Sequence, residues 1–404
     1  MEGIKAFRNS FTLQVGWSSC GHLIKNLIRI KSKIGIVIDV VFDLFSVLRE
    51  LIAAPAVTGF EEQRRGLIIE HFSKYCDSVS VDVIGNVIGT IGEGGRTVMI
   101  SAHYDQLGFM IKHVDDKGFA SIVNVGGWDP RAAYGERIKI WVGDGIEDYV
   151  TGIISTIPPH VTKPSERDKV PPITSMTLDF GAGSKEEAEG MGVHAGCVCT
   201  PTRELEYLGN KGSDLVIGPS NDDASALVSL LVALEELSEK PPNSLKVNVV
   251  ATVQEEVGSR GATVSGYNIH PWCTLNSDTT SVIAPGVPAS KVGDLKLGKG
   301  PIVCLGPAFT RAVWELMMKV AEEEGIPYQR RGVPGRSGND SWALQVARGG
   351  AFCGLLSMPN RYMHSSNEVV SLKDIENTGK LFAATVRALE KSKLKHTIEV
   401  FRRS

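Results

Sequence analysis

The cysteine pattern of this chain excludes a disulfide framework and a zinc ribbon. Seven cysteines lie scattered over 404 residues, an odd number with no CxxC pair. Scattered reduced thiols are typical of cytoplasmic proteins, so we expect a cytoplasmic location. The one close pair, Cys197 and Cys199, faces one side of an expected strand, which favours core or interface packing over metal binding.

Long hydrophobic runs and a large net charge are also missing. The apolar run from Ile34 to Leu48 contains Asp39 and Asp43, so it is too short and too charged to span a bilayer, and its pattern indicates an amphipathic helix. A formal net charge of -3 gives no reason to expect nucleic acid. With 42% hydrophobic and 22% charged residues, the composition predicts a globular protein without nucleic-acid or membrane partners.

Acidic residues are absent between Glu2 and Asp39, while lysines, arginines and serines recur. Residues 1–38 therefore form a basic extension that is either an organelle transit peptide or the product of a start codon placed too far upstream. We favour the second interpretation, because nothing in the segment joins the later pattern. Residues 393–404 form a short basic tail.

Helix and strand patterns alternate on both sides of a stretch with a different texture. Residues 106–201 show short strands separated by Gly, Pro and Asp turns, which indicates an inserted all-β domain. Residues 39–105 and 202–392 are then one discontinuous domain of the α/β class. We expect an open mixed sheet flanked by helices, with helices that include 44–53, 223–237, 310–324 and 372–391.

Two adjacent carboxylates, Glu255 and Glu256, follow the apolar run Leu245 to Val253 and precede a glycine-containing loop. In an open α/β sheet, ligands bind at the carboxyl ends of the strands. Neighbouring strand residues point to opposite faces, so both glutamates serve one site only where the strand has ended and the chain turns. One carboxylate could then hold a metal while the other moves a proton, although a solvated strand end is the favoured interpretation of this pair taken alone.

Four further segments place metal-binding side chains at strand ends or in loops. None is specific alone, since a lone histidine is usually structural and an aspartate pair suits a helix N-cap. The segments are His103-Tyr104-Asp105, Asn221-Asp222-Asp223, Asn276-Ser277-Asp278 and Tyr362-Met363-His364-Ser365.

Together with Glu255-Glu256, these segments resemble, in order and local context, the dinuclear aminopeptidases that assemble as tetrahedral particles, among them glutamyl and deblocking aminopeptidases. The resemblance runs from Asp43 to Lys391. It implies a zinc-peptidase type of fold whose β insertion is a dimerisation domain, with dimers assembling to a dodecamer. It also implies that short peptides are the substrates.

The resemblance assigns a role to each residue. Asp222 would bridge two divalent ions, and its bond to Asp223 would be a cis peptide. Glu255 would be the general base, taking a proton from the water between the ions and returning it to the leaving amine. Asp105 would fix the tautomer of a ligand histidine from behind. The remaining ligands would be His103 and Asp278 at one ion, and Glu256 and His364 at the other.

The donor set independently suits exchangeable metal sites. Two imidazoles and three carboxylates, without a thiolate, favour zinc or cobalt, with manganese as a further candidate. Two divalent ions per subunit would be nearly offset by the three carboxylates and would activate water for amide hydrolysis.

Departures from the family pattern leave the substrate open. Asn221 and Ala224 flank the aspartate pair where other residues are usual, Gln106 replaces an acid, and Asn339 replaces a threonine. A related dinuclear deacylase or carboxypeptidase is the main alternative, with Arg361 and Arg336 as candidate carboxylate-binding residues. A non-catalytic scaffold on the same fold is the third interpretation.

Overall fold

The structure is a computed structural model that describes residues 27–31, 37–41, 43–335, 337–392 and 394. The chain divides into two units, Met1–Asp43 and Leu44–Ser404. In the first unit, β1 (Leu27–Lys31) and β2 (Val37–Val41) pair antiparallel. Most of the basic extension, and the basic tail apart from residue 394, lie outside the described residues.

The prediction of an amphipathic helix over Ile34 to Leu48 is wrong for residues 37–41, because Val37–Val41 form the strand β2. The first helix begins only at Leu44. The segment is rich in β-branched residues, which fit a pleated strand better than a helix. A short apolar run cannot be assigned to helix or strand from its periodicity alone.

An eight-stranded mixed sheet forms the centre of the second unit, in the order β17-β16-β18-β15-β5-β14-β4-β3. Its four middle strands, β18, β15, β5 and β14, run parallel, while β4 pairs antiparallel with β14 and β16 pairs antiparallel with β18. This confirms the α/β class with an open mixed sheet. The bounds are β3 (Ser78–Val81), β4 (Val87–Ile91), β5 (Arg96–His103), β14 (Leu245–Thr252), β15 (Cys273–Ser281), β16 (Ile302–Leu305), β17 (Gln329–Gly332) and β18 (Phe352–Asn360).

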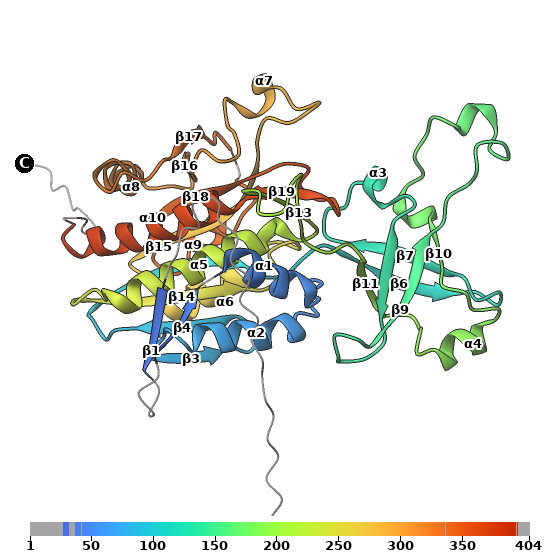
Figure 1. Cartoon of the computed structure of the whole chain (residues 1–404), viewed down its shortest axis with the longest axis horizontal. Helices are drawn as coiled ribbons and strands as arrows, with labels where there is room; N and C mark the ends of the chain where they lie inside the picture. Colours follow the sequence, from blue (N-terminus) through green and yellow to red (C-terminus); the bar gives the residue numbers. More distant parts are fainter. Residues whose placement is uncertain (1–26, 32–36, 42, 336, 393, 395–404) are drawn as a thin grey trace, which may run out of the picture. The chain divides into compact units, whose positions relative to one another are not determined.

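Helices cover both faces of this sheet (Figure 1), so its middle strands read as continuous apolar runs. Met99 and Val250 pack against Ala262 and Leu344 of α6 and α9, while α5 packs on β5 and β15. The bounds are α1 (Leu44–Ala53), α2 (Glu62–Phe72), α5 (Asn221–Glu239), α6 (Arg260–Ile269), α7 (Ala289–Val292), α8 (Arg311–Glu323), α9 (Ser341–Gln345) and α10 (Leu372–Glu390).

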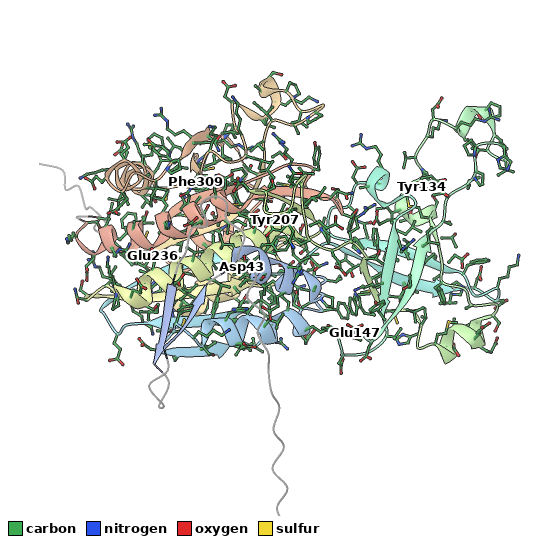
Figure 2. All side chains as sticks on the ribbon, in the orientation of Figure 1. Asp43, Tyr134, Glu147, Tyr207, Glu236 and Phe309 are labelled. Carbon is green, nitrogen blue, oxygen red and sulfur yellow. The ribbon has the colours of Figure 1, made fainter. Side chains whose placement is uncertain are left out.

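Helix α5 includes the helix expected over 223–237 and begins two residues earlier. It is buried on all sides from Asn221 to Leu234, because it lies between the sheet and the helices α1 and α10. Only near its end does charge reach the surface, where Arg387 of α10 lies 3.5 Å from Glu236, labelled in Figure 2. The buried helix therefore fixes the position of its own first turn.

The chain between β5 and α5 contains a closed barrel in the order β10-β7-β6-β11-β8-β9. Phe109 and Trp128 stack in its core with their ring centroids 4.9 Å apart. The hydroxyl of Tyr134, labelled in Figure 2, accepts a hydrogen bond from Ile157 N at 2.6 Å. The elements are β6 (Gly108–Val114), β7 (Ala120–Val125), α3 (Pro130–Ala133), β8 (Arg137–Trp141), β9 (Tyr149–Ile154), η1 (Pro164–Glu166), η2 (Ile173–Ser175), β10 (Thr177–Asp179), α4 (Lys185–Gly190) and β11 (Val198–Pro201).

A small antiparallel sheet joins β12 (Glu206–Tyr207), β13 (Leu215–Gly218) and β19 (Glu368–Ser371). It brings the chain before α5 beside the chain after β18, since Gly218 is paired with Glu368. In the described part of the chain, no helix has both the length and the apolar character needed to cross a bilayer.

Candidate metal centre

The candidate site lies at the carboxyl ends of the four parallel strands. His103 is the last residue of β5, Asp278 lies in the second half of β15, and His364 follows the end of β18. The register pairs Thr252 with His103, so the residues after β14 begin beside that histidine. Parallel strands present their ends at one edge of the sheet, which is why residues far apart in sequence meet here.

Glu255 and Glu256 reach one site because the strand ends before them. Gln254 adopts a left-handed backbone with φ +56° and turns the chain immediately after β14. The sequence indicated that glycines would permit this turn; Gly258, with φ +114°, serves only the later part of the loop. The carboxylate of Asp105 accepts hydrogen bonds from Glu255 N at 2.9 Å and from Glu256 N at 3.2 Å, which holds both glutamates.

Asp222 enters the site from the first turn of α5. The peptide bond between Asp222 and Asp223 is cis, as the family resemblance implied. The preceding Asn221 donates from Nδ2 to the carbonyl oxygens of Gly218 and Glu368, at 3.2 and 3.0 Å. These contacts tie the aspartate pair to the small sheet.

Two groups of three side chains share Asp222. His103, Asp222 and Asp278 form one group, Asp222, Glu256 and His364 form the other, and the ligand atoms of each lie within 4.8 Å of one another. The Nε2 atoms of His103 and His364 lie 3.3 and 3.4 Å from different oxygens of Asp222. The structure thus brings together all five side chains that the resemblance assigned as ligands.

Both histidines direct Nε2 into the site because their Nδ1 atoms are occupied. His103 Nδ1 lies 3.1 Å from the carbonyl oxygen of Asp105 and 3.4 Å from its carboxylate. His364 Nδ1 lies 2.9 Å from the carbonyl oxygen of Gly127. A carbonyl oxygen only accepts, so each Nδ1 carries a proton, and in the neutral imidazole Nε2 keeps the lone pair that a metal needs.

Burial and crowding disfavour ionised carboxylates in this site. Burial, together with the charge of Asp222, raises the pKa of Glu256 and of Asp278 well above their usual range. Burial is also the main cause that raises the pKa of Glu255 to about 8. Against the effect of burial, hydrogen bonds to Asp105 and Asp222 raise the pKa of His103 well above its ordinary value.

These residues fit divalent metal ions. In the described part of the chain, no lysine or arginine forms an ion pair with any of the five side chains. Glu256 Oε1 is buried without a hydrogen-bond partner. Buried carboxylates with no compensating cation are costly, and nitrogen and oxygen donors around a shared carboxylate suit two divalent ions.

Three residues that the sequence did not single out support the site. Thr58 Oγ1 donates to Asp105 Oδ2 at 2.8 Å, Gly127 contacts His364, and the Glu368 carboxylate accepts from Asp222 N and His364 N. The only sequence signal was that Glu368 lies four residues after His364. Sequence patterns show which residues carry chemistry, but not which distant backbone groups hold them.

Other residues that the sequence singled out are not among the five candidate ligands. Arg361 donates from Nε to the carbonyl oxygen of Ile283 at 2.9 Å, and Arg336 lies outside the described residues. Gln106 accepts a hydrogen bond from the fully buried Arg64. Asn339 Oδ1 accepts from Ser341 N at 3.1 Å, so it supports the start of α9.

Comparisons with known proteins identify the family of this chain. The family of M42 glutamyl aminopeptidases matches residues 85–381. A lysyl aminopeptidase of Pyrococcus furiosus is 31% identical over 349 residues, which are 86% of this chain and 97% of that protein.

Solved structures give the same result. An aminopeptidase from the archaeon Desulfurococcus kamchatkensis is 33% identical with a TM-score of 0.78, covering 85% of this chain and 94% of its own. The TET1 peptidase of Pyrococcus horikoshii is 31% identical with a TM-score of 0.74, covering 85% of this chain and 98% of its own. The chain therefore belongs to the M42 glutamyl aminopeptidase family and is a peptide-bond hydrolase.

Proposed function

We propose that this protein removes the N-terminal residue of short peptides, using two divalent metal ions and Glu255 as general base. The observation that carries the proposal is the pair of three-residue groups that share Asp222, with ligand atoms within 4.8 Å in each group. Family membership supports a metal-dependent aminopeptidase, while the number of ions and the role of Glu255 rest on the geometry.

His103, Asp222 and Asp278 would hold one ion, and Asp222, Glu256 and His364 would hold the other. Bound zinc or cobalt, with manganese as a further candidate, supplies Lewis acidity that polarises a scissile carbonyl and lowers the pKa of water. Glu255 would accept the proton of the attacking water and deliver it to the leaving amine. Asp105 would hold Glu255 near the attacking water by accepting a hydrogen bond from Glu255 N. It would also keep His103 in its Nδ1–H tautomer.

The protein is also proposed to act as an assembly in the cytoplasm. The barrel within residues 106–201 would provide the dimer contacts, and dimers would combine into a dodecamer, with residues 39–105 and 202–392 as the catalytic domain. The TET1 peptidase of Pyrococcus horikoshii, which can assemble into a tetrahedron or a large octahedral shell, supports this reading. Sedimentation velocity would test it, and a purely monomeric profile would contradict it. The cytoplasmic location rests on cysteine usage.

Metal depletion and readdition test the activity. We expect chelated protein to lose turnover of aminoacyl amides and to regain it with zinc, cobalt or manganese. A panel that includes lysyl and glutamyl substrates would identify the preferred N-terminal residue.

Glu255→Gln tests the general base. It should retain both ions and the fold while losing turnover by orders of magnitude; unchanged turnover would remove Glu255 from the mechanism. Cleavage of an N-acetylated peptide but not its free-amine form would favour the deacylase instead.

A further inference from the structure

Glu368 contacts the backbones of two ligand residues that lie on different segments of the chain. Its Oε2 accepts a hydrogen bond from Asp222 N at 2.7 Å, and its Oε1 accepts one from His364 N at 2.8 Å. The residue is only 2% exposed. One carboxylate thus joins the first turn of α5 to the loop after β18.

The position of Glu368 is itself fixed. It is the first residue of β19, where it is paired with Gly218 of β13. Its carbonyl oxygen accepts a hydrogen bond from Asn221 Nδ2 at 3.0 Å. Strand pairing and the bond from Asn221 therefore fix the backbone of Glu368. Its side chain can then fix the positions of Asp222 N and His364 N.

Asp222 and His364 both depend on this support, because neither has regular backbone geometry. His364 has φ +63°, a left-handed conformation that is rare for a residue with a side chain. Asp222 has φ -81° and ψ 101°, outside the helical range, at the start of a helix where backbone N–H groups have no intrahelical partner. For both N–H groups, the bond to Glu368 replaces the missing regular hydrogen bond.

We propose that Glu368 is a positioning residue that sets the spacing between Asp222 and His364, and thereby the affinity of the metal position that they share with Glu256. This inference rests on the proposed two-metal function. A carboxylate is required because each oxygen accepts one N–H. In a glutamine, the amide nitrogen would face one of the two N–H donors, and that backbone group would be left buried and unsatisfied.

Asp374 offers a matched control elsewhere in the fold. Its two oxygens also accept backbone N–H groups at 2.7 Å, from Gly298 and Gly300, and within the described part of the chain it forms no hydrogen bond with any of the five candidate ligands. Asp374→Asn should therefore lower thermal stability and leave metal binding unchanged. Loss of a contact that orients a metal ligand typically weakens metal affinity by about 10- to 100-fold.

The test measures binding of Co²⁺ to chelated protein by competition with a chelator, together with the visible spectrum of each bound equivalent. In Glu368→Gln we expect one of two equivalents to bind about 10- to 100-fold more weakly with an altered spectrum, and kcat to fall more than KM rises. If Glu368→Gln does not fold, Glu368→Asp decides, because the shorter side chain cannot reach both N–H groups and should weaken the same equivalent.

The outcomes separate the two proposals. Wild-type protein that binds two ions, with Glu368→Gln and Glu368→Asp binding both as tightly and with the same spectrum, would overturn the role of Glu368 alone. Wild-type protein that binds fewer than two ions would overturn the two-metal function, and the role of Glu368 with it. A loss of affinity in Asp374→Asn as large as in Glu368→Gln would show general destabilisation and also overturn the inference.

Discussion

His364 Nδ1 donates to the carbonyl oxygen of Gly127 at 2.9 Å, although 237 residues separate them. Gly127 follows β7 of the barrel, whereas His364 follows β18 of the main sheet. A second bond joins the same two regions, from Ser366 Oγ to Glu136 Oε2 at 3.1 Å. The chain that follows β7 therefore contributes a backbone contact to the candidate site.

Gly127→Ala should weaken the metal position that includes His364. A Cβ at this residue would lie 3.2 Å from His364 Nδ1 and 3.3 Å from Cε1, so the ring must shift by a few tenths of an ångström. We expect metal affinity to fall by up to about 10-fold, at the low end for displaced supports of a ligand, with an unchanged fold. Chelator competition measures the effect. Gly349→Ala is the control, since no atom lies within 4 Å of its added Cβ; equal affinities in both variants would contradict the prediction.

Asp105→Asn should reduce kcat much more than it changes KM. The carboxylate accepts from both Glu255 N and Glu256 N, and the amide of an asparagine would oppose one of them. We expect a loss of about 10²-fold, since small displacements of a catalytic group have effects of this size. Steady-state kinetics on an aminoacyl amide would measure it.

Thr58→Val should reduce kcat less than Asp105→Asn does. It removes the 2.8 Å hydrogen bond from Thr58 Oγ1 to Asp105 Oδ2, together with a longer one of 3.4 Å to the carbonyl oxygen of Gln106, and it leaves both bonds from Asp105 to the glutamates. Thr58 contacts Asp105 and neither glutamate, so its kinetic effect should be smaller than that of Asp105→Asn. A larger effect in Thr58→Val would contradict the prediction, because it would show that Thr58 acts by a route other than Asp105.

The sequence was sufficient to predict the sheet and the set of residues at its edge, and the reason is local. The apolar runs that end in His103 and Val253 specify buried strands, and the polar residue after each run marks the end that carries ligands. The sequence could not predict that α5 is buried all round, because that depends on α10, which is encoded about 150 residues later. Nor could it predict the contact of Gly127 with His364, because every residue has a backbone carbonyl and the residue type does not show which one forms the bond.

The chelated protein should lose stability as pH rises from about 6 to 9. The hydrogen bond to Asp222 raises the pKa of His364 to about 9, and burial raises the pKa of Glu255 to about 8. Each group then binds more protons in the folded than in the unfolded state over this range, so the free energy of unfolding falls with rising pH. The lowered pKa of Asp222, caused by its histidine partners against the effect of burial, acts only at more acidic pH.

Differential scanning fluorimetry at pH 6, 7, 8 and 9 would measure this trend. We expect the Tm of chelated protein to fall by several degrees between pH 6 and 9. Added zinc should raise Tm at every pH, because a ligand at a hundred times its dissociation constant adds about 2.7 kcal/mol to the free energy of unfolding. The rise in Tm on adding zinc should be largest at high pH, where the ligand carboxylates of the site are ionised. A chelated protein that is more stable at pH 9 than at pH 6 would contradict the assigned shifts.

Gly379→Ala should destabilise the contact between α5 and α10. A Cβ at Gly379 would lie 2.5 Å from the carbonyl oxygen of Ser229 and 2.5 Å from Val232 Cβ, so the two helices must separate. Overpacking of this kind costs about 1–3 kcal/mol, even though alanine is otherwise the better helix residue. Gly66→Ala in α2 is the matched control, because nothing lies within 4 Å of its added Cβ. It should stabilise by about 0.5–1 kcal/mol in urea unfolding. Opposite signs for these two glycine-to-alanine changes are the expected result, and a stabilised Gly379→Ala would show that α5 is not held by close packing against α10.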